Sequence, residues 1–183
     1  MKLRVAIAGL VGLGMAVGLL DPLGVRFNLT GSLPLGIYLV SSEAPSRGSI
    51  VHVCLQGDAA EFARQRGYLG PGTCDSGVRP LGKIVLAIEG DVVTNERESV
   101  LVNGKRVANS ETIIEDSRGR ALPHHAWGEH RMRAGELWLF SPYHRNAYDS
   151  RYFGPIERSQ VVSALRPVLV LPRSAQATEY TSK

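Results

Sequence analysis

The strongest structural signals of this chain lie in the stretch Asn28-Leu29-Thr30-Gly31-Ser32-Leu33-Pro34-Leu35-Gly36-Ile37-Tyr38. Gly31 and Pro34, two residues that favour turns, lie on either side of one serine. A β-branched and aromatic run starts at Gly36. The pattern predicts a turn that holds Ser32 in place and leads directly into a strand.

An apolar segment precedes this stretch. Lys2 and Arg4 form a short basic flank, and the sixteen residues from Val5 to Leu20 carry no charge. A helix of that length spans about 24 Å, slightly less than the ~30 Å core of a bilayer. No small-x-small cleavage site follows at residues 18–21, so we expect residues 1–20 to form an uncleaved membrane anchor with the remainder outside. A cleaved signal peptide and a buried core helix are the alternatives.

The bulk composition indicates one ordinary folded domain. The 183 residues are 44% hydrophobic and 21% charged, with a formal net charge of +4. The basic residues are scattered, which argues against nucleic-acid binding and is compatible with weak attraction to anionic lipid. We expect a domain over residues 21–172, followed by a polar tail over residues 173–183.

The domain is predicted to be mainly β, with one or two short helices, behind the N-terminal apolar helix. Strands are predicted over residues 36–40, 49–54, 83–88, 100–102, 105–107, 136–140 and 161–171. Asn103-Gly104 is a strong hairpin signal between two of them. A helix is predicted over residues 59–66, with Asp58 as its N-cap and Gly67 at its end. Residues 109–130 are predicted to be irregular.

The two cysteines, Cys54 and Cys74, are predicted to form a disulfide if the chain is exported to an oxidising compartment. The bond would close a loop with nineteen residues between the cysteines, a stabilisation of about 3 kcal/mol in the chain-entropy model. A free cysteine pair is the alternative. We expect no metal and no cofactor, because the cysteine spacing does not suit metal ligands and the histidines at 124, 125 and 130 lack an acidic cluster with ligand spacing.

Ser32 and Lys83 can form a catalytic pair. A serine hydroxyl needs a base to become a nucleophile, and a lysine can serve if burial keeps its amine neutral. Lys83 opens an apolar run that continues to Ile88, which suits a buried amine. The alternative interpretations are that Ser32 is an ordinary turn residue and that Lys83 lies on an edge strand, where it prevents aggregation. Thr30 stands two residues before the serine, where its hydroxyl and the Ser32 amide could converge on a developing oxyanion.

Three motifs resemble boxes of a known family in their order along the chain. The first is Asn28-x-Thr30-x-Ser32-x-Pro34-x-Gly36-x-Tyr38, the second runs from Lys83 to Gly90-Asp91, and the third is Asp149-Ser150-Arg151-Tyr152-Phe153-Gly154-Pro155. Together they are similar to the TraF-type signal peptidases of conjugative transfer systems, a branch of the signal peptidase I family. The resemblance implies the mainly β signal-peptidase fold and a serine endopeptidase.

The resemblance also implies roles for individual residues. Ser32 would attack the scissile carbonyl, and neutral Lys83 would accept its proton. Ser150 would orient the lysine amine by a hydrogen bond, and the Thr30 hydroxyl with the Ser32 amide would form the oxyanion hole. Four further residues would shape the site without taking part in the chemistry: Pro34, Gly36, Asp149 and Arg151.

The expected partners are an exported pre-protein, bound as an extended strand and cut after small residues, and membrane lipid. The domain would face the periplasm from the bacterial inner membrane, and the substrate would be a pilin precursor of a conjugative or type IV secretion system. One departure from general signal peptidases is that residues 141–146 replace their usual Gly-Asp-Asn. The alternatives are a general type I signal peptidase and a catalytically silent assembly protein of the same fold.

Overall fold

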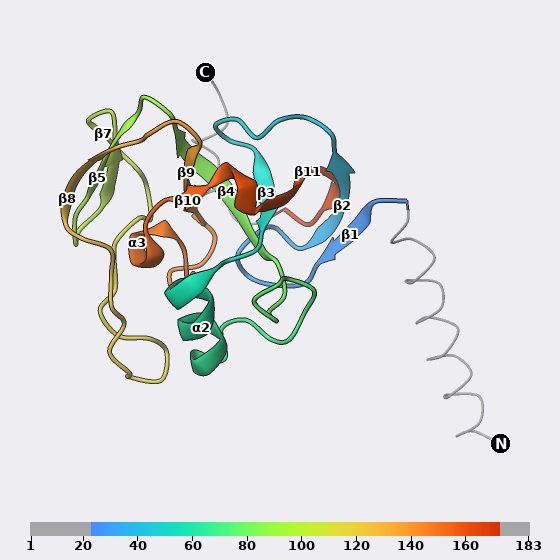
Figure 1. Ribbon diagram of the computed structural model, residues 1–183, viewed down its shortest axis with the longest axis horizontal. Coiled ribbons are helices and arrows are strands. Elements are labelled where there is room, and N and C mark those ends of the chain that lie inside the picture. The colour runs from blue at the N-terminus through green and yellow to red at the C-terminus, as the bar shows by residue number, and fades with distance from the viewer. Residues whose placement is uncertain (1–22, 173–183) are drawn as a thin grey trace.

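The computed structural model describes residues 23–172, so the predicted anchor over residues 1–20 and the tail over residues 173–183 lie outside the described residues. A seven-stranded antiparallel sheet with the order β1-β2-β11-β3-β4-β9-β10 dominates this part of the chain (Figure 1). Its strands are β1 (Val25–Asn28), β2 (Gly36–Ser41), β3 (Ile50–Val53), β4 (Leu81–Ile88), β9 (Glu136–Phe140), β10 (Ile156–Glu157) and β11 (Val161–Val170). The predicted mainly β fold is confirmed.

A second, four-stranded sheet has the order β7-β6-β5-β8. It consists of β5 (Val92–Asn95), β6 (Val100–Val102), β7 (Lys105–Arg106) and β8 (Gly128–Arg131). The predicted hairpin is confirmed, because Asn103 and Gly104 connect β6 to β7 with positive φ angles of 52° and 77°. The prediction that residues 109–130 are irregular is wrong at the end of that range, because residues from Gly128 onward form β8. It forms because β5 pairs with it along the edge left open by β6.

Two α-helices accompany the sheets, α2 (Gly57–Arg66) and α3 (Ser150–Phe153). The prediction of Asp58 as an N-cap is wrong, since α2 begins at Gly57 and Gln56 takes the cap position. Asp58 lies in the first turn instead, where its charge favourably meets the helix dipole. Gly67 ends the helix in a left-handed conformation with a φ of 72°, as predicted. Among residues 23–172, no helix is long and apolar enough to cross a membrane.

The larger core lies between the seven-stranded sheet and α2. Cys54 and Cys74 form a disulfide that closes the loop carrying this helix. The core side chains come from β3, α2, β4 and β9 and include Val51, Val53, Ala60, Ala63, Val85 and Leu139. A smaller core joins β4 and β9 to the second sheet around the fully buried Trp138. Both cores therefore fix β4, the strand that carries Lys83.

Candidate active site

The loop between β1 and β2, residues 29–35, carries Ser32, and we call it the nucleophile loop. Asn28 holds its shape. The Asn28 side-chain amide donates to the carbonyls of Thr30 and Leu33 at 3.0 Å and of Pro34 at 3.1 Å. Its Oδ1 accepts from the amide of Thr30 at 3.3 Å and from its hydroxyl at 2.8 Å. The sequence pattern included Asn28 but indicated no role for it. Its five partner atoms, in Thr30, Leu33 and Pro34, come close to it only in the folded loop.

The hydroxyls of Ser32 and Thr30 are in contact, with their oxygens 3.1 Å apart. Thr30 has one hydroxyl proton, which it donates to Asn28, so Ser32 is the donor in this contact. Thr30 Oγ1 thus lies beside Ser32 Oγ, and its predicted role as an oxyanion donor stays a prediction. The Thr30 hydroxyl proton must leave its hydrogen bond to Asn28 before it can be donated to a substrate oxygen.

Pro34 and Gly36 fix the chain after the serine. The carbonyl of Pro34 accepts a hydrogen bond from the buried Tyr38 hydroxyl at 2.7 Å. Gly36 has a φ of 158° and pairs so closely with β11 that a Cβ atom there would lie 2.2 Å from the Leu169 carbonyl oxygen. A side chain at position 36 would therefore push β11 away from the nucleophile loop.

Lys83 lies on β4, an interior strand paired with β3 on one side and β9 on the other. The alternative reading of an edge-strand lysine is therefore wrong. The side chain is 1% exposed, and Nζ donates to the carbonyl of Gly82 at 3.2 Å. Burial lowers the Lys83 pKa from 10.5 to about 8, although the nearby Asp149 carboxylate opposes this shift and Arg151 adds to it. The amine is neutral in a substantial fraction of molecules near pH 8.

Gly82 allows the nucleophile loop to approach β4. A Cβ atom on Gly82 would lie 2.9 Å from Leu33 Cδ1, and Leu33 is fully buried. Leu33 is the residue directly after Ser32. Gly82 is the residue directly before Lys83, so the nucleophile loop packs against β4 next to the position of the lysine.

Ser141 makes a second contact between these parts of the chain. Its Oγ donates to the carbonyl of Ser32 at 2.6 Å, and the residue is 1% exposed. Ser141 follows Phe140, which pairs with Ile84, the residue after Lys83. The nucleophile loop is thus held against β4 and β9 at positions that flank the lysine. In the sequence, Ser141 stands out only as the first of residues 141–146, which replace the usual Gly-Asp-Asn motif, and no role could be predicted for it.

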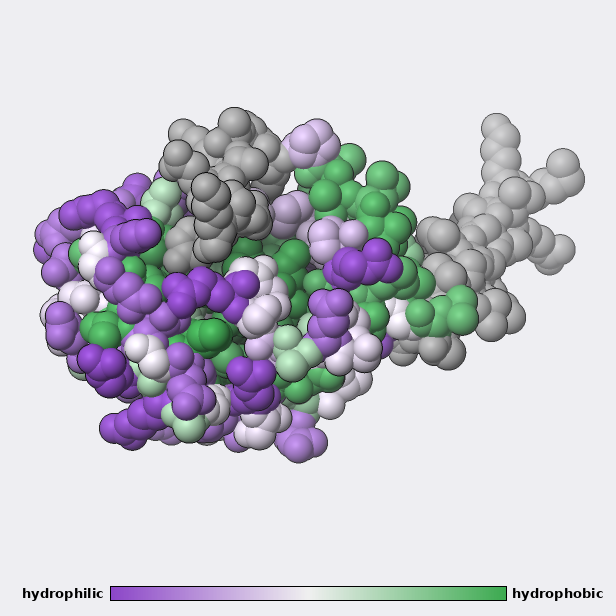
Figure 2. All heavy atoms as spheres, turned by 90° about the horizontal axis from the view of Figure 1, so that it is seen from above, coloured by the Kyte–Doolittle hydropathy of each residue, from purple (hydrophilic) through white to green (hydrophobic). Residues whose placement is uncertain are grey.

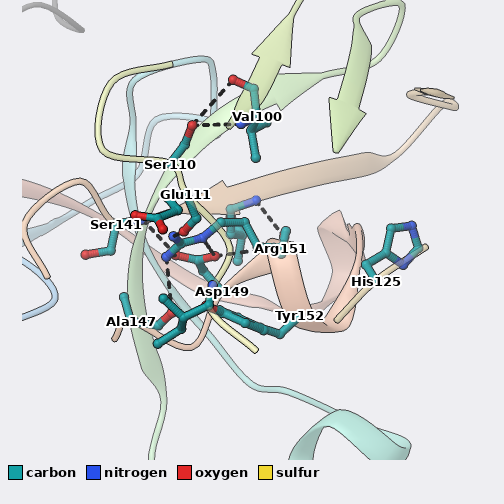
Figure 3. A network of polar contacts seen from close by, with 12 residues as sticks. Val100, Ser110, Glu111, His125, Ser141, Ala147, Asp149, Arg151 and Tyr152 are labelled. Carbon is teal, nitrogen blue, oxygen red and sulfur yellow. Dashed lines mark hydrogen bonds and ion pairs between the residues drawn. The ribbon is translucent and has the colours of Figure 1, made fainter. Parts of the chain in front are cut away.

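Asp149 and Arg151 form a fully buried ion pair beneath the site (Figure 3). The guanidinium Nε and Nη2 donate to the two carboxylate oxygens at 2.8 Å each. The guanidinium also contacts the carbonyls of Glu111 and Ala147 and the rings of Phe140 and Tyr152. Asp149 accepts the amide of Ser141 at 3.3 Å and caps α3 through the Arg151 amide. The pair therefore supports the segment that holds Ser32.

Ser150 is buried at the start of α3, and its Oγ accepts the amide of Leu139 at 2.8 Å. Within residues 23–172, the structure does not pair Ser150 with Lys83, whose amine donates to the Gly82 carbonyl. The hydrogen bond that Ser150 makes ties α3 to β9. Its predicted role in orienting the lysine stays a prediction.

A family model and two relatives match this chain over most of its length. The model of the signal peptidase family, peptidase S26, matches residues 1–169. A plasmid transfer protein TraF from Escherichia coli is 37% identical over 166 residues, which cover 90% of this chain and 93% of that protein. A conjugal transfer protein TraF from Agrobacterium fabrum is 39% identical over 166 residues, which cover 88% and 91%. A crystal structure of a signal peptidase I from Enterococcus faecalis aligns with a TM-score of 0.41 and 16% identity, covering 69% of this chain and 100% of that one.

Proposed function

Because this chain belongs to the signal peptidase family, peptidase S26, we propose that it is a serine endopeptidase with Ser32 as nucleophile and Lys83 as general base. One observation carries the proposal. Lys83 is almost fully buried on β4, against which the nucleophile loop packs at Gly82, and its pKa is lowered to about 8. Burying a lysine amine costs stability, and the lowered pKa leaves a substantial fraction of this amine neutral near pH 8, as a general base requires.

The proposed reaction starts with attack of Ser32 Oγ on the scissile carbonyl carbon. The serine proton passes to neutral Lys83, and the resulting ammonium protonates the leaving amine as the peptide bond breaks. Water then attacks the acyl ester while Lys83 accepts its proton, the bond to Ser32 Oγ breaks, and Lys83 returns the proton to Ser32 as the new carboxylate leaves. The Ser32 amide and the Thr30 hydroxyl stabilise the oxyanion in both steps.

The proposed substrate is an exported precursor bound as an extended strand and cut after small residues, and in particular a pilin precursor of a conjugative system. The relatives support this choice, since their names describe plasmid transfer and conjugal transfer proteins. The proposed location is the periplasmic face of the inner membrane. The disulfide between Cys54 and Cys74 supports an oxidising compartment.

An exposed apolar surface supports contact with lipid. It lies over β1, β2 and the end of β11, which are neighbours in the sheet. Its large hydrophobic side chains are Leu23, Phe27, Leu29, Val40, Val168, Leu169 and Leu171, which are 41–83% exposed. Figure 2 shows hydrophobic residues gathered over this end, whereas hydrophilic residues cover much of the opposite end. Because Leu29 is in the nucleophile loop, lipid contact would place the site close to a membrane-bound precursor.

Precursor processing by the purified full chain in detergent tests the proposal, with Ser32→Ala as the control. We expect cleavage of a conjugative pilin precursor and none by the variant. Equal cleavage of an unrelated secretory precursor would instead indicate a general type I signal peptidase. A folded protein that cleaves neither precursor would indicate a silent assembly protein.

The rate should depend on pH through Lys83. We expect kcat/KM to rise about tenfold for each pH unit below the pKa of about 8 and to level off above it, because the neutral amine is the active form. At pH 6 only about one hundredth of the amines would be neutral. The measurement is the initial cleavage rate between pH 5.5 and 9.5, with circular dichroism at each pH to confirm folding. An acid optimum would contradict the assignment of the base.

Ser141 should act as a positioning residue. We expect Ser141→Ala to lower kcat about tenfold with little change in KM, since loss of one hydrogen bond of ~1.4 kcal/mol would loosen the Ser32 backbone. Ser141→Thr keeps the hydroxyl and should recover activity, and the exposed Ser159→Ala serves as control. The midpoint of the pH profile should not move. A shift of that midpoint would assign Ser141 to the lysine instead.

A further inference from the structure

We propose that Asn28 is a positioning residue of the cleavage reaction, which fixes the Thr30 hydroxyl beside Ser32 so that this hydroxyl can donate to the oxyanion. The inference rests on the peptidase function proposed above and adds to it a residue that does not touch the substrate. It is carried by the place of Asn28 at the base of the nucleophile loop, by the orientation of its side-chain amide, and by the effect of that amide on Thr30.

Asn28 lies where the nucleophile loop begins and ends. It is the last residue of β1 and pairs with Gly36, the first residue of β2. The sheet therefore fixes the backbone of Asn28, while its half-buried side chain bonds to the loop. Its partners are two, five and six positions further along the chain, so one side chain spans almost the whole loop.

The partner atoms determine the orientation of the side-chain amide. Its nitrogen lies at 3.0, 3.0 and 3.1 Å from three carbonyl oxygens, which can only accept. Its Oδ1 lies 3.3 Å from the Thr30 amide nitrogen, which can only donate. Exchanging oxygen and nitrogen would place acceptor against acceptor and donor against donor. Oδ1 is therefore the acceptor for the Thr30 hydroxyl, whose oxygen lies 2.8 Å away.

This acceptor selects the side-chain rotamer of Thr30. Thr30 is exposed, so water could satisfy its hydroxyl in any of the staggered rotamers if Asn28 were absent. The hydrogen bond to Asn28 favours the rotamer in which Thr30 Oγ1 lies 3.1 Å from Ser32 Oγ. Rotation about the Cα–Cβ bond of Thr30 would move the hydroxyl away from the nucleophile. Asn28 thus holds the donor ready before the substrate arrives.

Asn28 can also release the Thr30 proton when the oxyanion forms. Its Oδ1 has a second donor, the Thr30 amide, so this oxygen stays hydrogen-bonded after the hydroxyl proton turns to the substrate. The side-chain amide is uncharged, whereas a carboxylate in its place would hold the proton about twice as strongly. Asn28 itself neither gains nor loses a proton, so it acts on the reaction only through Thr30.

Steady-state cleavage of the precursor by the purified full chain in detergent tests the proposal in a double-mutant cycle. We expect Thr30→Val to lower kcat about 10²-fold, a typical cost of losing one oxyanion donor. Asn28→Ala should lower kcat about tenfold and leave KM unchanged, because the hydroxyl that it frees acts only in the transition state. In the Thr30→Val background, Asn28→Ala should lower kcat less than about twofold, because no hydroxyl remains to be positioned.

Matched variants complete the cycle. Thr30→Ser keeps the hydroxyl, so in its background Asn28→Ala should again lower kcat about tenfold. Asn28→Leu has a branched side chain of similar size without polar atoms, should behave like Asn28→Ala, and replaces it if the alanine variant does not fold. Thr73→Val changes an exposed threonine outside the nucleophile loop and should leave kcat and KM unchanged. Urea unfolding of each variant confirms that the fold is intact.

The outcomes separate this proposal from the proposed function. A wild-type protein that does not cleave the precursor would overturn both. An equally large effect of Asn28→Ala with and without the Thr30 hydroxyl would show that Asn28 only supports the loop, which refutes the positioning role and leaves the peptidase function intact. A rise in KM at constant kcat would assign Asn28 to substrate binding instead. Wild-type kcat in both Asn28→Ala and Asn28→Leu would remove Asn28 from the reaction.

Discussion

Replacing Lys83 by methionine is expected to lower kcat/KM for precursor cleavage by about 10³-fold, within the range for loss of a general base. Methionine keeps an unbranched apolar stem of similar length in a site that is 1% exposed, and it removes only the amine. A combined Ser32→Ala and Lys83→Met variant should lose little more than either single variant, because the two residues act as a unit. Single-turnover cleavage of the precursor measures the chemical step directly.

The same substitution should not destabilise the fold. Below pH 8 the lysine carries its proton both folded and unfolded, so the folded state bears the full cost of burying an ammonium group. Between pH 8 and 10.5 the unfolded chain binds more protons than the folded one, so wild-type stability rises with pH. Urea unfolding should therefore show Lys83→Met to be at least as stable as wild type at pH 7, with an advantage that shrinks as pH rises.

The exposed Lys105 on β7 supplies the control, since Lys105→Met should change neither the cleavage rate nor the stability. Wild-type cleavage by Lys83→Met would remove the lysine from the mechanism. A large loss of stability would show instead that the amine supports the fold, and the lost activity would then say nothing about a base.

Elements with a complete local pattern could be predicted from the sequence. Strand β9 has the predicted bounds, Glu136–Phe140, because an apolar run between turn residues is itself the signal. The Asn103-Gly104 hairpin was predictable because its two residues accept the positive φ angles that the turn needs. Ser32 and Lys83 each stand at a distinctive place in their own segment, and their assignment as nucleophile and base stays a prediction.

Elements that depend on distant partners could not be predicted. Strand β1 has the sequence Val25-Arg26-Phe27-Asn28, whose apolar–polar alternation covers only four residues, and its pairing with β2 defines it as a strand. The helix α3 has only four residues, and the carboxylate of Asp149 starts it. The hydrogen bond from Ser141 to Ser32 joins residues 109 positions apart. This contact exists only after β4 and β9 have paired, so no local sequence pattern can predict it.

Loss of Arg151 should have the largest effect on stability. We expect Arg151→Met to lower the free energy of unfolding by about 3–5 kcal/mol, because it leaves the carboxylate of Asp149 buried without its partner. Both side chains are 0% exposed, so water cannot replace the lost bonds. Two backbone carbonyls, those of Glu111 and Ala147, would lose their donor as well. Urea unfolding at pH 7 measures the change.

The pair of Arg145 and Glu111 is the matched control, because its side chains are 68% and 55% exposed at an N–O distance of 3.1 Å. Arg145→Met should cost less than about 1 kcal/mol, as expected for an exposed ion pair. A double variant, Asp149→Leu with Arg151→Met, removes both buried charges and should recover part of the stability that Arg151→Met loses. If the double variant were no more stable than Arg151→Met, Asp149 would support the fold mainly through Ser141 and α3 rather than through its ion pair. The cleavage rate would then depend on the hydrogen bond from the Ser141 amide to Asp149 and not on the Arg151 guanidinium. Ser141 is the residue that contacts Ser32.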